Sequence, residues 1–248
     1  MSLSFKSHIP VFDANIGVGH RHNRRYPYDT PERLLEEMAR HGVDRALVYA
    51  VQGELISPTQ GNDQLAQWTD KQASLIPQYV AGNDPGSIVQ LEELHTAGKL
   101  TSVRLHNTVE CKVPFTQWLY GDLLEWVSAH RIPIWISLAD TPPTEIVDTF
   151  RHYPGLTVVL LGAHYVHATM VRPILKALPN ATLELSRYEN LCGIEKLVEE
   201  IGARRLMYGS FFPRYAMGPV LFALHRATIS EDDLEAICSR NLESILES

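Results

Sequence analysis

Cationic and proton-exchanging side chains recur where short apolar runs of this chain end. Arg104 and His106 are two residues apart, so on a strand both side chains lie on one face. Guanidinium groups bind carboxylates and phosphates through paired hydrogen bonds, and a cleft lined by such groups attracts small anions. Similar residues follow four other apolar runs: His20, Arg21, His22, Arg24 and Arg25; His164, Tyr165 and His167; Ser186, Arg187 and Tyr188; Arg214 and Tyr215.

The elements that must position these residues alternate along the whole chain. Short β-rich runs are separated by longer segments with apolar residues at helical spacing. The predicted strands are residues 10–16, 45–51, 77–82, 101–106, 133–138, 157–161, 182–186 and 205–209. Eight strands that alternate with helices in 248 residues are typical of a (β/α)8 barrel, an α/β TIM barrel. A doubly wound open sheet is the alternative that this pattern leaves open.

The helix signals are consistent with one continuous fold. Thr30 and Pro31 predict a capped helix start, and His41-Gly42 predicts its end. An additional C-terminal helix is expected over residues 229–246, starting at Ser230 with Asp233 three residues later. No change of composition or low-complexity linker divides the chain. We therefore expect residues 1–248 to form a single domain.

Two segments resemble landmarks of the amidohydrolase superfamily, in its amidohydrolase-related branch. They are Ile9-Pro-Val-Phe-Asp-Ala-Asn-Ile-Gly17 and Arg205-Leu-Met-Tyr-Gly-Ser-Phe-Phe-Pro213. The family usually has Asp-x-His-x-His in the first and Gly-Ser-Asp-x-Pro in the second. The C-terminal helix also resembles the closing helix of the family, so the resemblance covers the whole chain. It implies a TIM barrel whose site lies at the carboxyl ends of the strands.

The resemblance also implies a metal site, but its ligand positions hold other residues here. Asn15, Gly17, Ser137, Gly162 and Phe211 stand at the five positions, and none of these is a strong metal ligand. We therefore predict a degenerate member of the family without a metal or other cofactor, with Phe211 packed beside Asn15, Gly17 and Gly162. The alternative is a displaced zinc site built from histidines that follow the strands: His20, His22, His164 and His167.

Three functions remain open on this evidence. The first is a metal-free protein that binds a small carboxylate-type anion for a non-catalytic purpose. The second is a metal-independent hydrolase, similar to lactonases of this branch, or a decarboxylase. The third is a metal-dependent hydrolase that uses His20, His22 and His164. The expected ligand-binding residues are Arg104, His106, His164, His20, His22, Asn15 and Arg187.

We expect the best-formed pocket to be lined by Arg104, His106 and His164, with His20 or His22. A structural role for Arg104 is the alternative, as an ion-pair partner of the strand residue Glu184.

Composition limits the partners. The net charge of −7 argues against nucleic acid, because neutralising phosphates needs a basic face. The longest apolar runs are too short to span a membrane, and residues 1–6 lack the apolar stretch of a secretory signal. Cys111, Cys192 and Cys238 are expected to be buried and reduced, as in a cytoplasmic protein. The sequence leaves open whether copies of the chain associate as a homo-oligomer.

Overall fold

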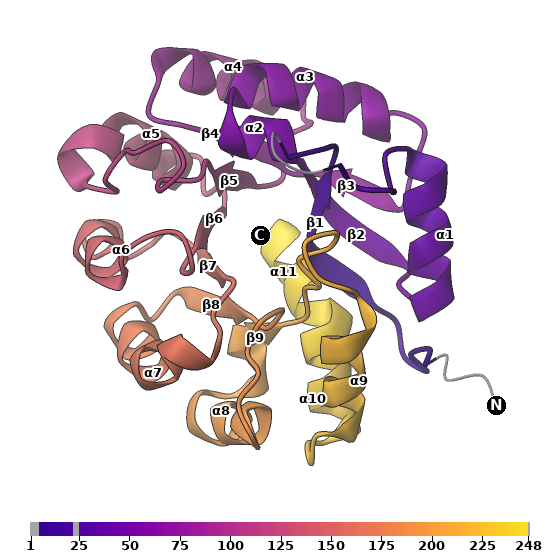
Figure 1. The fold of residues 1–248 in the computed structure, drawn as a ribbon. Helices are drawn as coiled ribbons and strands as arrows, with labels where there is room; N and C mark the ends of the chain where they lie inside the picture. The colour runs from indigo at the N-terminus through magenta and orange to yellow at the C-terminus, as the bar shows by residue number, and fades with distance from the viewer. Residues whose placement is uncertain (1–4, 22–24, 248) are drawn as a thin grey trace.

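The computed structural model describes residues 5–21 and 25–247. Its strands form a ring with helices around it, which confirms the predicted α/β TIM barrel (Figure 1). All neighbouring strands pair in parallel, in the orders β1-β2-β3 and β4-β5-β6-β7-β8-β9. The strands are β1 Phe12–Val18, β2 Arg45–Ala50, β3 Leu75–Pro77, β4 Tyr79–Ala81, β5 Val103–Leu105, β6 Ile134–Ser137, β7 Val158–Leu161, β8 Ala181–Glu184 and β9 Leu206–Met207.

The third strand of the barrel is divided into two short strands, β3 and β4, where we predicted one strand over residues 77–82. β3 pairs with β2, and β4 pairs with β5. Between them, the backbone N–H of Gln78 donates to the carbonyl of Val48 at 2.7 Å. The preceding Pro77 has no N–H to donate. Gln78 is thus still hydrogen-bonded to β2, whereas the residues that follow it, in β4, pair with β5.

The first and last strands close the ring. Ala14 N–H donates to the carbonyl of Tyr208 at 3.1 Å, and Gly17 N–H donates to the carbonyl of Phe212 at 2.7 Å. The register of β1 shifts between Asp13 and Ile16. The Asp13 carboxylate is buried at this irregularity, where it accepts from the N–H groups of Asn15 (2.9 Å) and Ser210 (3.0 Å). A side chain thereby satisfies backbone donors that regular pairing would otherwise satisfy.

The helices cover the outside of the ring. Thr30 caps α1 by accepting from Arg33 N–H, and Gly42 ends the helix with a φ of 72°, as its sequence predicts. The helices of the outer layer are α1 Pro31–His41, α2 Val51–Leu55, α3 Pro58–Thr69, α4 Pro85–Thr96, α5 Gln117–Ala129, α6 Pro143–Phe150, α7 Ala168–Ala177, α8 Gly193–Ile201 and α9 Gly218–Arg226.

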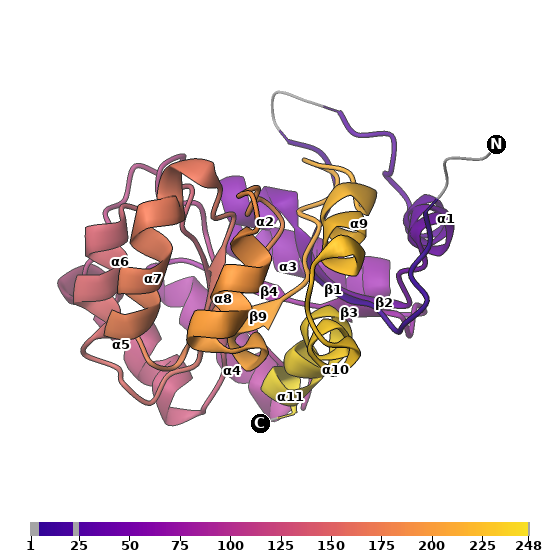
Figure 2. The same cartoon turned by 90° about the horizontal axis from the view of Figure 1, so that it is seen from below.

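The predicted C-terminal helix is present and closes the amino end of the barrel (Figure 2). It runs as α10 Glu231–Glu235, one π-helical turn over Ala236–Arg240, and α11 Asn241–Leu246. The hydroxyl of Ser230 accepts from Asp233 N–H at 3.1 Å and so caps it. Leu242 joins the apolar cluster of the barrel interior, which also contains Phe12, Leu47, Trp135, Val159, Leu161 and Met207. Chemistry can therefore be sought only at the opposite, carboxyl end.

Two composition-based expectations can be compared with the structure. All three cysteines are free, but only Cys238 is buried, while Cys111 is half-buried and Cys192 is exposed. The expectation of buried thiols is therefore wrong for Cys192, because this residue lies in the connection before α8 rather than inside a helix. In the part of the chain that the structure describes, no helix has the length and apolar character needed to cross a membrane.

Candidate functional site

Arg104 is buried inside the barrel rather than open to its mouth. Only 1% of the residue is exposed. Its Nε and Nη2 lie 2.9 Å and 2.8 Å from Glu54 Oε1, and its Nη1 donates to Asn15 Oδ1 at 3.2 Å. The guanidinium carbon is 3.6 Å from the centre of the Tyr49 ring. This geometry revises the expected role of Arg104: it is an internal ion-pair partner, of Glu54 on α2 rather than of Glu184.

Asn15 extends the network to Glu184 on the other side of the barrel. The Asn15 amide donates to Glu184 Oε2 at 3.3 Å. Glu184 also accepts from Gly162 N–H (3.2 Å), from Ser186 N–H (2.7 Å) and from the Ser186 hydroxyl (2.9 Å). Burial raises the pKa of Glu184 to about 7, although these hydrogen bonds act in the opposite direction. Glu54, Arg104, Asn15 and Glu184 thus form one buried polar chain across the barrel.

Phe211 packs over this chain. The residue is 3% exposed, which confirms that its ring is buried. A Cβ atom placed on Gly162 would lie 3.4 Å from Phe211 Cε1, so the ring covers Gly162 as predicted. Gly17 instead faces Tyr49 and Val51, and a side chain there would come within 2.8 Å of Val51 Cγ2. The Phe211 ring therefore packs against Gly162, whereas Gly17 packs against Tyr49 and Val51.

The five positions where the resemblance predicts metal ligands therefore serve other contacts. Asn15 and Gly162 bind Glu184, the Ser137 hydroxyl donates to Asp140 Oδ2 at 2.7 Å, and Phe211 contributes only apolar surface. Within residues 5–21 and 25–247, no group of three or more His, Cys, Asp or Glu side chains could hold a metal ion. A guanidinium already supplies positive charge beside Asn15. The residues at these positions do not fit a catalytic metal ion.

The predicted histidines lie apart from this network. His20 is exposed, and its Nδ1 accepts from Tyr26 N–H at 3.1 Å. His164 pairs with His167, the ring centres being 4.7 Å apart. His22 lies outside the described residues. His20 and His167 thus each accept a hydrogen bond from a backbone N–H, whereas Nδ1 of His164 is buried without a hydrogen-bond partner among the described residues.

His106 is also held internally. Its Nε2 is 2.5 Å from the hydroxyl of Tyr120, a fully buried residue, and burial lowers the pKa of His106 while nearby Asp84 opposes this. The expected pocket of Arg104, His106 and His164 is replaced by these internal contacts. A space of about 10 Å³ remains above the network, lined by Arg21, Tyr26, Tyr49, Val51, Glu54, Phe211, Phe212, Pro213 and Arg214.

Three arginines from three different connections surround this mouth of the barrel. Arg21 follows β1, Arg187 follows β8 and Arg214 follows β9. The Arg187 guanidinium lies 4.1 Å, and that of Arg214 5.9 Å, from the centre of the Tyr215 ring. Their carboxylate contacts are long, at 3.5 Å for Arg21 with Glu110, 3.9 Å for Arg187 with Glu189, and 3.9 Å for Arg214 with Asp140. The mouth therefore carries positive charge that is only loosely paired.

The Nε of Arg187 is also a buried donor without a hydrogen-bond partner among the described residues. A buried donor of this kind costs free energy unless something accepts from it. Sequence reasoning predicted Arg187 at this end of the barrel, but it missed Glu54 and Tyr49. The signal for Glu54 is its place as the one carboxylate of a short, mostly apolar helix directly after β2.

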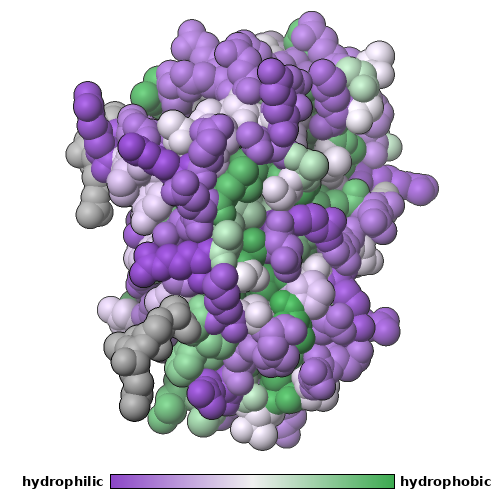
Figure 3. Space-filling model, turned by 90° about the vertical axis from the view of Figure 1, so that its right-hand side faces the viewer, coloured by the Kyte–Doolittle hydropathy of each residue, from purple (hydrophilic) through white to green (hydrophobic). Residues whose placement is uncertain are grey.

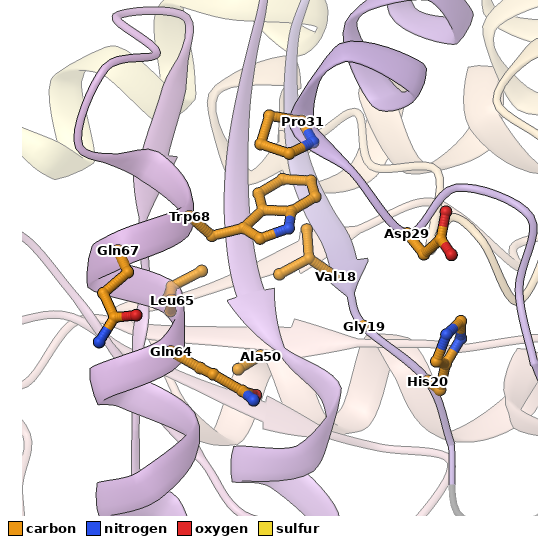
Figure 4. A pocket seen from close by; sticks show the side chains of 10 residues that line it. All are labelled: Val18, Gly19, His20, Asp29, Pro31, Ala50, Gln64, Leu65, Gln67 and Trp68. Atoms are coloured by element: carbon orange, nitrogen blue, oxygen red, sulfur yellow. The ribbon is translucent and has the colours of Figure 1, made fainter.

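A larger cavity lies beside the mouth, on the outside of the barrel (Figure 4). Its volume is about 440 Å³. It is bounded by the ends of β1 and β2, the start of α1, and α3, and it is lined by Val18, Gly19, His20, Asp29, Pro31, Ala50, Gln64, Leu65, Gln67 and Trp68. Among the described residues of the expected pocket, only His20 lines it. Figure 3 shows the side of the molecule that carries α1, where apolar residues form a band between polar ones.

Comparisons with known proteins agree with the fold. No curated protein matches the chain. Among solved structures, an uncharacterised TIM-barrel protein from Bordetella bronchiseptica has a TM-score of 0.77 at 16% identity, over 96% of this chain and 99% of its own. The 5-carboxyvanillate decarboxylase of Sphingomonas paucimobilis has a TM-score of 0.77 at 15% identity, over 96% and 99%.

A dihydroxybenzoic acid decarboxylase from Polaromonas sp. JS666, with bound manganese and the inhibitor 2-nitroresorcinol, has a TM-score of 0.76 at 15% identity, over 96% and 97%. At such identities these structures establish the fold alone. The family model described as amidohydrolase matches residues 9–244, which is nearly the whole chain. The chain therefore belongs to the amidohydrolase family.

Proposed function

We propose that this protein binds a small molecule with a carboxylate group at the mouth of the barrel, and that it does so without a metal ion at the usual position of the family. The observation that carries the proposal is the set of loosely paired arginines, Arg21, Arg187 and Arg214, around the aromatic rings of Phe211 and Tyr215. Two of the similar structures are decarboxylases of aromatic carboxylates by name, which supports a ligand of this class.

The chemistry of the mouth suits a carboxylate on an apolar body. Guanidinium groups donate two parallel hydrogen bonds to a carboxylate, and the unpartnered Nε of Arg187 supplies one such donor. The rings of Phe211 and Tyr215 offer apolar surface next to the same arginines. The small free space means that side chains at the mouth, such as the half-exposed Arg214, must move to admit a ligand.

In this proposal the barrel interior supports the residues of the mouth and takes no part in a reaction. The Arg104 guanidinium donates to Asn15, and Glu54 balances its charge, so the interior needs no further cation. A metal-independent hydrolase or decarboxylase and a non-catalytic binding protein would share this ligand and differ in turnover.

Titration calorimetry with benzoate and 2,6-dihydroxybenzoate tests the proposal. Arg187→Gln and Arg214→Gln should each weaken binding by ~1.5–3 kcal/mol, the scale of a hydrogen bond to a charged group, which corresponds to at least about ten-fold in Kd. Arg151→Gln is the matched control, because Arg151 also makes a 3.9 Å contact with a carboxylate but directly follows α6, away from the mouth. Equal affinities in all four proteins would refute the assignment.

Metal analysis tests the second half of the proposal. Protein purified without chelator should contain far less than one equivalent of zinc or manganese. Near-stoichiometric metal whose removal abolishes a hydrolase or decarboxylase activity would instead support the displaced site of His20, His22 and His164. Product analysis with the same carboxylates separates a metal-free enzyme from a binding protein.

A further inference from the structure

The outer cavity of about 440 Å³ is separate from the mouth and has different chemistry. Its floor is apolar and buried, formed by Val18, Ala50 and Leu65. None of the described residues that line it is a lysine or arginine, and the carboxylate among them, Asp29, lies 2.9 Å from Arg33 Nη1. A cavity whose lining carries a carboxylate and no cation disfavours anions. A ligand of the mouth is therefore not the ligand of this cavity.

Apart from the Asp29 carboxylate, the polar side chains around the cavity carry amide, indole and imidazole groups. In Figure 4, the indole of Trp68 and the side chain of Gln64 point from α3 into the space, and His20 and Asp29 bound it from the other side. No described residue makes a hydrogen bond with the side-chain amide of Gln64 or the indole N–H of Trp68. Because His20 Nδ1 accepts from Tyr26 N–H, the neutral imidazole carries its proton on Nε2. These groups offer three N–H donor groups, the Gln64 amide, the Trp68 indole and the His20 imidazole, and the carboxylate acceptor of Asp29.

We propose that this cavity binds an uncharged ring compound that carries hydroxyl groups. A hydroxyl both donates and accepts, so it can pair with the Gln64 amide, with His20 Nε2–H or with the Asp29 carboxylate. The flat indole of Trp68 packs against one face of a ring, as aromatic side chains do when they bury apolar surface. A volume of about 440 Å³ lies within the usual range for small-molecule pockets. Both a sugar and a phenol have this chemistry.

Saturation-transfer NMR and titration calorimetry on the full chain distinguish the two sources. The sugar arm uses methyl β-glucoside and methyl β-galactoside, and the phenol arm uses resorcinol and catechol. Each arm includes a carboxylated counterpart, glucuronate or 2,6-dihydroxybenzoate. Saturable binding of the neutral compounds in either arm supports the proposal and names the source. Absence of saturable binding in both arms overturns it.

Two variants tie such binding to the cavity. Gln64→Ala should weaken it by roughly three- to ten-fold, the scale of one neutral hydrogen bond, and Trp68→Ala by about ten-fold or more. Trp118→Ala is the control, because this tryptophan is 76% exposed on α5 and lies outside the cavity. Gln64 is exposed, so its variant keeps the fold and remains informative if Trp68→Ala destabilises the protein. Binding that both variants leave unchanged would overturn the proposal, as would tighter binding of the carboxylated counterparts that depends on Trp68.

Discussion

Replacing Arg104 by methionine should destabilise the protein by a large fraction of its total stability. Methionine preserves much of the side-chain volume but removes two contacts to Glu54, at 2.9 Å and 2.8 Å, and one donor to Asn15 at 3.2 Å. Glu54 is 5% exposed and would keep a buried carboxylate without a counter-charge. Removing one partner of a buried ion pair costs ~3–5 kcal/mol, against a typical total of ~5–15 kcal/mol. The contact with the Tyr49 ring, at 3.6 Å, is lost as well.

Urea unfolding followed by circular dichroism measures this change. Arg172→Met is the matched control, because Arg172 lies 2.7 Å from Glu200 but its side chain is 42% exposed, and exposed pairs contribute only ~0–1 kcal/mol. The double variant Glu54→Leu/Arg104→Met should lose less than the sum of its two single variants, since it leaves no lone buried charge. If Arg104→Met and Arg172→Met were equally stable, the interior network would not stabilise the barrel.

Two further results follow from the barrel interior. Phe211→Ala should lower the free energy of unfolding by ~3–5 kcal/mol, since it opens a cavity beside Gly162, and a loss below about 1 kcal/mol in urea unfolding would contradict this packing. The pKa of Glu184 is raised by burial from 4.5 to about 7, so the folded protein binds the proton more tightly than the unfolded chain. The stability that this protonation contributes is complete below about pH 4.5 and is lost as the pH rises towards 7 and beyond. Unfolding measured at pH 5 and pH 8 should therefore show a smaller loss of stability in Glu184→Gln than in the wild-type protein, and identical losses would refute the assignment.

The sequence predicted the parts of this structure that depend on local pattern. Periodicity and capping residues located the barrel strands and the start of α1 at Thr30, because these signals act within a few residues. The large ring of Phe211 and the missing side chain of Gly162 predicted their mutual packing, because the resemblance placed both at one end of the barrel. These predictions depend only on residues that are close in sequence or on the strand order that the resemblance implies.

The partners inside the barrel could not be predicted in the same way. Arg104 has two carboxylates within the same interior, and the choice of Glu54 over Glu184 depends on where the short helix α2 places its side chain. The division of the third strand at Gln78 depends on the change of neighbour from β2 to β5. Cys192 was expected to be buried, but it is exposed in the connection directly before α8. Each outcome is set by tertiary contacts rather than by local preference.

The seam between β1 and β9 has a consequence for how the chain is made. Asp13 accepts from the N–H of Ser210, a residue 197 positions further along the chain. During synthesis, β1 therefore has one unsatisfied edge until the segment around Ser210 has left the ribosome. An open strand edge can pair with another chain, and contacts this distant in sequence form slowly. The nascent protein is thus most exposed to aggregation just before its last strand emerges, and a truncation before residue 206 should accumulate as insoluble material where the full chain stays in solution.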